Sequence, residues 1–208
     1  MATRTYNDAA QKVKGTSGAD TFYMGGGDDQ ALMGGGNDRV YGQDGNDHLR
    51  GDAGNDRVAG DAGNDYVHGD AGNDVLFGGE GIDRLYGGDG ADNMAGNIGN
   101  DALYLGLNDG DRDVVNFSID STTQNGQDTI YEFNPYGQDR LSLGGLVEWY
   151  DLDSNYDGRV NAYDDSVYTS GSSNLVLNLS SATGQYSDYQ TITLANVYEL
   201  DSSDFLFV

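Results

Sequence analysis

An uninterrupted nine-residue repeat runs through the first half of this amino-acid sequence. Ten aspartates mark the repeat at intervals of nine residues: Asp20, Asp29, Asp38, Asp47, Asp56, Asp65, Asp74, Asp83, Asp92 and Asp101. A glycine stands two residues before each of them: Gly18, Gly27, Gly36, Gly45, Gly54, Gly63, Gly72, Gly81, Gly90 and Gly99. Every unit must therefore adopt nearly the same local structure and stack on its neighbours, which favours a solenoid over any other fold.

The units share the consensus Gly-Gly-x-Gly-x-Asp-x-U-x, in which U is apolar and the first two glycines vary. The ten U positions are all apolar: Phe22, Ala31, Val40, Leu49, Val58, Val67, Leu76, Leu85, Met94 and Leu103. The x-U-x triplet predicts a short strand with its central side chain pointing inward. The six residues before it predict a turn, in which glycine permits positive φ angles and lets carbonyl groups crowd around an ion. The sequence thus predicts an all-β solenoid over residues 15–104.

The charge balance indicates that the solenoid needs cations. Asp and Glu number 35 against 10 Lys and Arg, which gives a net charge of -25. Stacked like charges are destabilising, and carboxylate and carbonyl oxygens are ligands that suit calcium. The chain has no cysteine and only two histidines, which disfavours a thiolate or zinc site. Nucleic acid is not expected as a partner, because binding its phosphates requires many basic residues.

Export and membrane signals are sparse in the sequence. No apolar run approaches the roughly 18 residues of a transmembrane helix. Residues 1–14 lack the apolar segment of a signal peptide, so no cleavable signal is expected there. These observations predict no transmembrane segment and leave any export signal to another part of the chain.

The repeats resemble those of the RTX (repeats-in-toxin) family of secreted proteins, which includes serralysin-type proteases, lipases, pore-forming toxins and the R-modules of mannuronan epimerases. The resemblance covers residues 15–104 and extends more weakly through residues 126–133 and 139–143. It implies a parallel β-roll with two nonapeptides per turn, so that each unit stacks on the next but one. The ending, residues 200–208, is similar to type I secretion signals. Export through type I secretion machinery, in an unfolded state, and folding outside the cell are therefore expected.

With this stacking, the resemblance implies two rows of aspartates and about eight calcium ions between successive turns. The predicted ligands are the ten repeat aspartates, together with the turn glycines Gly27, Gly36, Gly45, Gly54, Gly63, Gly72, Gly81 and Gly90. An alternative is that the aspartates only cap turns through hydrogen bonds to the backbone, but that would not explain two charged rows. The other acidic turn residues are expected to be solvated: Asp44, Asp52, Asp61, Asp70, Glu80 and Asp89.

After Tyr104 the nine-residue phase is lost, and alternating apolar residues predict an antiparallel, β-rich cap over residues 105–208. Such an atypical terminal unit closes the open core of a solenoid, while residues 1–14 are expected to be a lead-in. Residues 153–164 fit the D-x-N-x-D-G pattern of a dockerin or EF-hand-like calcium loop. One further calcium ion is predicted there, with ligands from Asp153, Asn155, Asp157, Arg159 and Asp164. The alternative is an ordinary Asn/Asp/Gly-rich loop.

No enzymatic motif is present, since the sequence lacks both H-E-x-x-H and G-x-S-x-G. We therefore expect a secreted, extracellular, non-enzymatic module that folds on binding calcium and supports type I secretion and stability. Two alternatives remain open. The first is a carbohydrate-binding module for an alginate-like polysaccharide, with contacts from Arg39, Arg50, Arg57, Tyr66 and Tyr86. The second is a matrix or surface protein that self-associates.

Overall fold

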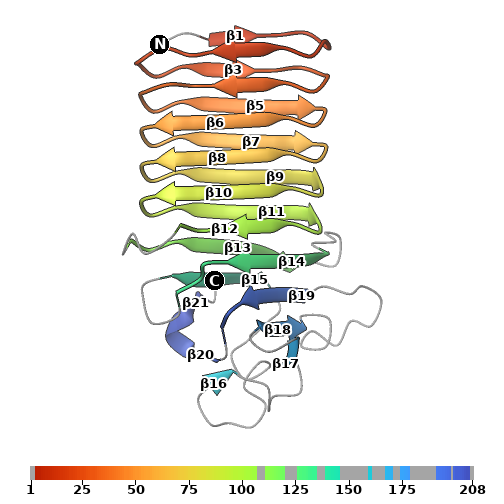
Figure 1. Cartoon of the computed structure of the whole chain (residues 1–208), viewed down its shortest axis with the longest axis vertical. Helices are drawn as coiled ribbons and strands as arrows, with labels where there is room; N and C mark the ends of the chain where they lie inside the picture. The colour runs from red at the N-terminus through yellow and green to blue at the C-terminus, as the bar shows by residue number, and fades with distance from the viewer. Residues whose placement is uncertain are drawn as a thin grey trace.

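The chain winds into an elongated β-roll, seen here in a computed structural model (Figure 1). The structure describes residues 3–106, 111–119, 126–134, 139–145, 159–160, 167–170, 174–178, 191–197 and 199–206. Apart from one short 3₁₀ helix, Ser202–Asp204, the regular elements in these ranges are all strands. The described residues contain no helix long and apolar enough to cross a membrane.

Two long sheets form the walls of the roll. The order of the first sheet is β1 (Thr3–Thr5), β3 (Thr21–Tyr23), β5 (Arg39–Asp44), β7 (Arg57–Ala62), β9 (Val75–Gly81), β11 (Asn93–Gly99), β13 (Val114–Ile119), β15 (Arg140–Gly145) and β21 (Phe205–Leu206). The order of the second sheet is β17 (Val167–Ser170), β18 (Asn174–Asn178), β19 (Thr191–Ala195), β14 (Gln127–Tyr131), β12 (Ala102–Tyr104), β10 (Arg84–Asp89), β8 (Tyr66–Ala71), β6 (His48–Ala53), β4 (Gln30–Leu32) and β2 (Lys12–Lys14).

The register confirms that two nonapeptides make one turn of the roll. Val40 pairs with Val58 in the first sheet, and Leu49 pairs with Val67 in the second, in both cases 18 residues apart and in parallel strands. Successive units therefore alternate between the two sheets. The expected all-β parallel roll is confirmed by this pairing.

The core lies between the two sheets and consists of the U residues of the repeat. All ten are fully buried, while their neighbours along each strand are mostly exposed or half-buried. This alternation follows from the two-residue period of a strand. Each valine, leucine, methionine or phenylalanine among them contributes roughly 1.5–3 kcal/mol when it leaves water, so a single continuous core stabilises the roll along its length.

The turns place non-glycine residues in the left-handed backbone region. The second residue of the unit is Asp61 in one representative turn, with φ +75°, and the fourth is Gly63, with φ +145°. Asp and Asn tolerate the left-handed region better than other L-residues do, which accounts for Asp52, Asp61 and Asp70 at this second position. These aspartates thus have a backbone role that composition alone did not indicate.

A row of asparagine side chains ties successive turns together at the fifth position of the unit. Oδ1 of Asn46 accepts the backbone N–H of Asn64 at 2.9 Å, and Oδ1 of Asn55 accepts that of Asn73 at 3.1 Å. Each of these bonds runs from a later turn to the side chain of the earlier one. The recurrent Asn-Asp pairs of the sequence therefore supply two separate side chains for joining turns.

The roll begins earlier than the nine-residue spacing of aspartates indicated. β1 pairs in parallel with β3, and β2 pairs in parallel with β4. Gln11 takes the place of the repeat aspartate, and its backbone N–H donates to Oδ1 of Asp29 at 2.6 Å. At this end the Arg4 guanidinium lies 5.2 Å from the centre of the Phe22 ring, and the Tyr6 ring meets that ring edge-on. Residues 3–14 are thus two further strands of the roll, and Arg4 and Tyr6 cover part of its end.

The parallel sheets also continue past Tyr104. β13, β15 and β21 extend the first sheet, and β14 and β19 extend the second. Antiparallel pairing, which was expected across residues 105–208, occurs between β17, β18 and β19, and between β16 (Arg159–Val160) and β20 (Leu200–Asp201). The predicted strands therefore exist, but several of them lengthen the roll in place of forming a separate antiparallel layer.

Candidate metal sites in the turns

The ten repeat aspartates form two rows, one along each edge of the roll. All are buried, with at most 3% of their surface exposed. In both rows, Oδ1 of one aspartate accepts the backbone N–H of the aspartate 18 residues earlier; Asp65, for example, accepts from Asp47 at 2.7 Å and Asp56 accepts from Asp38 at 2.7 Å. This geometry confirms the stacking of alternate units and fixes each carboxylate against the preceding turn.

Three further aspartates that sequence reasoning missed extend these rows. Oδ1 of Asp113 accepts the N–H of Asp92 at 2.8 Å, and Oδ1 of Asp128 accepts that of Asp101 at 2.9 Å. Asp139 in turn accepts from Asp113 at 3.2 Å. All three precede an apolar residue by two positions, as in the repeat. That Asp-x-apolar triplet was the available signal, although the nine-residue spacing had been lost.

The second carboxylate oxygen of most repeat aspartates faces a different environment. Oδ2 is buried and accepts no hydrogen bond in eight of them: Asp29, Asp38, Asp47, Asp56, Asp65, Asp74, Asp83 and Asp101. An ionised oxygen buried without a partner is costly, and removing water from a charge without compensation costs several kcal/mol. These atoms therefore require either a cation or a proton.

Glycine at the first position of the unit creates the space for such a cation. A Cβ built on Gly51 would collide with Oδ2 of Asp56 and would lie 2.9 Å from the carbonyl oxygen of Gly69 in the next turn. The same carboxylate contact recurs at each first-position glycine of this stretch: Gly42, Gly51, Gly60, Gly69, Gly78, Gly87 and Gly96. Hard oxygens converge on the space that an absent side chain leaves, and calcium binds such oxygens at about 2.3–2.6 Å. We call these seven places the glycine cradles.

The donor set of a cradle is mainly backbone. Among the residues that the structure describes, no three His, Asp or Glu side chains come together as a metal-binding group. Carbonyl oxygens must therefore supply most ligands beside a single repeat carboxylate, which is within the range of calcium coordination. The structure places one repeat carboxylate, through Oδ2, at each cradle and uses its Oδ1 for a hydrogen bond to the backbone.

The N-terminal units lack cradles. Met24 and Met33 occupy the first position of their units, where the cradles have glycine, and both methionine side chains are fully buried. In the first unit, Oδ2 of Asp20 accepts the N–H and the hydroxyl of Thr16, each at 2.8 Å. Candidate sites therefore concentrate from Gly42 onward, and the predicted ligands Asp20, Asp29 and Asp38 lie where the geometry is least suited to a cation.

Burial shifts the acidity of the aspartates strongly. Burial is the main cause that raises the pKa of Asp47, Asp56, Asp65 and Asp83 to about 7. Hydrogen bonds from the backbone lower these pKa values, and neighbouring aspartates raise them further. Burial is also the main cause at Asp128, where the pKa rises to about 8. Near neutral pH, protons and metal ions thus compete for the same carboxylates.

These shifts predict that acid partly replaces calcium. A pKa raised in the folded state means that protonation stabilises the roll at a pH below the ordinary Asp value of 3.8, and that this stabilisation is lost as pH rises through about 7. The calcium-free chain should gain β structure when the pH falls from 8 to 4. Far-UV circular dichroism in calcium-free buffer measures the change. A spectrum that is independent of pH across this range would contradict the role of the buried carboxylates.

The cradles also predict that aspartates differ in their contribution to calcium binding. Asp56→Asn removes the charge beside the cradle of Gly51 while keeping an acceptor for the N–H of Asp38. We expect this variant to raise the calcium concentration at the folding midpoint. Asp20→Asn is the matched control, because Oδ2 of Asp20 is bonded to Thr16. Equal midpoints for the two variants, measured by calcium titration, would show that the cradle does not decide which carboxylate binds.

The predicted loop site falls largely outside the described residues. Asp153, Asn155, Asp157 and Asp164 are not among them, and of Arg159 only the backbone is described, within β16. Its pairing with Asp201 of β20 places this part of the chain beside the C-terminal residues. The calcium loop therefore stays a prediction.

The residues named for carbohydrate contact lie on two different faces. Arg39 and Arg57 are on the first sheet, while Arg50, Tyr66 and Tyr86 are on the second. Two of them are already engaged: Arg57 lies over the Phe77 ring at 4.4 Å, and Arg50 forms two hydrogen bonds to Asp70. The structure does not bring these five side chains together into one surface.

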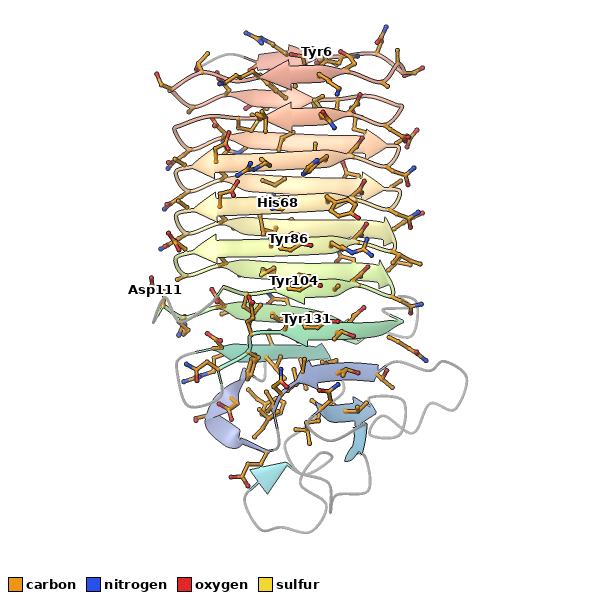
Figure 2. The ribbon with its side chains drawn as sticks, in the orientation of Figure 1. Tyr6, His68, Tyr86, Tyr104, Asp111 and Tyr131 are labelled. Carbon is orange, nitrogen blue, oxygen red and sulfur yellow. The ribbon has the colours of Figure 1, made fainter. Side chains whose placement is uncertain are left out.

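An aromatic column runs down the second sheet. The rings of His68, Tyr86, Tyr104 and Tyr131 stack in succession with centroids 4.4–4.6 Å apart and planes within 8° of parallel (Figure 2). Each ring thereby covers the face of the next. Neighbouring strands are held in register by these contacts, as expected for cross-strand aromatic pairs.

The first half of the chain matches a known family of repeats. The sequence profile of the family described as "RTX calcium-binding nonapeptide repeat (4 copies)" matches residues 7–31, 33–67 and 68–103. Among solved structures, the solution structure of the AlgE6R3 subunit from the Azotobacter vinelandii mannuronan C5-epimerase matches with 20% sequence identity and a TM-score of 0.31, over 96% of this chain and 78% of that one. No curated protein sequence matches the chain.

Proposed function

We propose that this chain, which carries RTX calcium-binding nonapeptide repeats between residues 7 and 103, is a module that binds calcium in the turns of its β-roll and folds as it does so. The observation that carries the proposal is the row of buried Oδ2 atoms without hydrogen-bond partners, each beside its own turn. Six of these atoms lie at glycine cradles, which give them a place to meet a cation. We assign no catalytic activity to the chain.

Binding and folding are coupled because a cradle exists only when turns are stacked. The cradle of Gly51 combines an oxygen of its own unit with the Gly69 carbonyl 18 residues later. In an unfolded chain these groups are far apart, and the net charge of -25 favours an expanded chain. When no site exists in the unfolded state, the free energy of metal binding becomes free energy of folding.

This coupling supports a role in secretion. Extracellular calcium modules bind at about 10⁻⁴–10⁻³ M, far above the concentrations to which cytosolic sensors respond. The chain would therefore remain unfolded inside the cell, pass through type I secretion machinery in that state, and fold outside. Residues 200–208 would carry the export signal, and residues 153–164 would bind one additional calcium ion.

Calcium stoichiometry tests the proposal directly. Native mass spectrometry of the calcium-loaded chain should show about seven ions from the cradles, with one more from residues 153–164. Asp157→Asn should lower the count by one while leaving the roll folded, and Asp56→Asn should lower it by one in the roll. A count of one or two ions in a fully folded chain would contradict the cradles as calcium sites.

The geometry gives less support to binding of a polysaccharide. Sugars stack on exposed faces of aromatic rings, whereas Tyr86 lies between His68 and Tyr104 with both faces covered. Arg84 lies over the Tyr66 ring at 5.2 Å. We therefore do not include carbohydrate recognition in the proposed function.

A further inference from the structure

The two histidines of the chain lie next to each other in the folded roll. His48 is on β6 and His68 is on the adjacent β8, 20 residues later. Their ring centroids are 5.4 Å apart, with the ring planes inclined by 45°. Both lie on the outer side of the second sheet, where His48 is exposed and His68 half-buried. No other histidine exists in the sequence.

This separation matches two imidazoles that share one metal ion. Zinc binds histidine nitrogen at about 2.0–2.1 Å, in the plane of the ring, which puts the ion about 3.2 Å from the ring centroid. For a tetrahedral angle at the ion, the two centroids would then lie about 5.2 Å apart. The observed centroid separation of 5.4 Å is close to this value.

The surroundings hold His68 in place and favour a cation. The ring of His68 stacks on that of Tyr86 at 4.4 Å, which limits its rotation. The nearby Arg50 is bound by Asp70 at 2.7 Å and lies 3.8 Å from Asp52, so these three side chains together carry one negative charge.

We propose that His48 and His68 form a second kind of metal site, for a borderline divalent cation such as Zn²⁺. Imidazole suits zinc, copper and nickel, whereas the oxygen cradles suit calcium. In the described part of the chain no third His, Asp or Glu side chain joins the pair as a metal-binding group, so water completes the coordination. The site rests on the pairing of β6 with β8 and contains none of the cradle oxygens.

Zinc binding at this pair is coupled to folding. The two side chains come from different strands and meet only when β6 and β8 are paired. A ligand that binds the folded state alone shifts the equilibrium toward it. Zinc should therefore lower the calcium concentration needed to fold the chain, and this shift should disappear when either histidine is replaced.

Zinc titration of the full chain under saturating calcium tests the site, because calcium then occupies the oxygen ligands. Isothermal titration calorimetry should show saturable binding of one zinc ion, lost in His48→Gln and in His68→Gln. Tyr66→Phe is the matched control: it alters the neighbour of His48, whose ring lies 5.8 Å away, without removing a nitrogen ligand. Circular dichroism of each variant in calcium checks that the roll is folded.

Nuclear magnetic resonance of the unaltered chain provides an independent measurement if a variant fails to fold. The imidazole signals of both histidines should shift together as the first equivalent of zinc is added. No saturable binding to the unaltered chain would overturn the proposal. Binding that persists in the double variant, or a shift of only one histidine, would also overturn it and would assign the zinc to carboxylates or to a single side chain.

Discussion

Removing calcium from the purified chain is expected to unfold the roll completely. Without a cation, the buried Oδ2 atoms of the two rows are left charged and unpartnered, and eight such atoms carry a cost far above the 5–15 kcal/mol that stabilises a typical domain. At pH 7.5, a chelator should convert the far-UV circular dichroism spectrum from β-sheet to that of an unfolded chain. The near-UV signal of the stacked tyrosines Tyr86, Tyr104 and Tyr131 should disappear at the same chelator concentration.

Magnesium is the control for this experiment. It has the charge of calcium but demands octahedral geometry at 2.0–2.1 Å and releases its water reluctantly, whereas the cradles present backbone carbonyls held at fixed positions. Calcium should restore both spectra and magnesium should not. Equal recovery in the two ions would show that charge screening drives folding, and retention of the β spectrum in chelator would contradict the coupling of folding to metal binding.

A charge placed in the core should have an effect almost as large. Leu76 is fully buried and pairs with Val58 on one side and Met94 on the other. In Leu76→Asp, a carboxylate would lie between apolar side chains, away from the cradles that could offer it a cation. Burying an unpaired charge costs many kcal/mol unless the group is neutralised. We expect no calcium-induced folding at concentrations that fold the unaltered chain, as followed by circular dichroism.

Ile82→Asp is the matched control for this substitution. Ile82 lies in a turn of the same roll with 53% of its surface exposed, so the same change in charge remains in water. This variant should fold with a calcium midpoint close to that of the unaltered chain. If Leu76→Asp folded equally well, Leu76 would not lie in a closed core and the inward orientation of the U residues would be wrong.

The repeat made most of the roll predictable from sequence. A constant interval of nine residues, with turns of one length, specifies both the inward residue of each strand and the stacking of Asp47 on Asp65. A fold with this periodicity can be predicted without knowing contacts between distant parts of the chain, because every unit contacts only its neighbours. The fold class, the two rows and the inward U residues followed from it.

Turns of other lengths hid the continuation of the roll. The intervals between stacked aspartates grow to 21 residues from Asp92 to Asp113 and to 27 from Asp101 to Asp128. Longer connections change the sequence spacing while leaving the strand pairing intact, since closing a longer loop costs little more free energy. At the other end, Gln11 stands at the position of a repeat aspartate. It can do so because that position donates its backbone N–H to Oδ1 of Asp29, a bond that does not depend on the side chain of the donor residue.

The cradles were not predictable from the ligand residues alone. The sequence prediction rested on the aspartate and on the glycine two residues before it, and it did not consider the first position of the unit. That position is glycine at Gly42 and Gly51 but methionine at Met24 and Met33. The difference matters only because that position faces Oδ2 across a turn, a contact between residues five apart that becomes evident in three dimensions. Sequence therefore indicated the carboxylates but not which of them face open space.

The 18-residue register also gives the roll a parity. Removing or adding two consecutive units returns every later strand to its own sheet. If the units of Val58 and Val67 were removed, for example, Leu76 would take the place of Val58 as the partner of Val40. Removing a single unit would instead transfer every later strand to the opposite wall, so that the column of His68 and Tyr86 would be divided between two faces. Surfaces that span several turns can therefore survive changes in repeat number only in even steps, and insertions or deletions of one nonapeptide should rearrange whatever the outer faces bind.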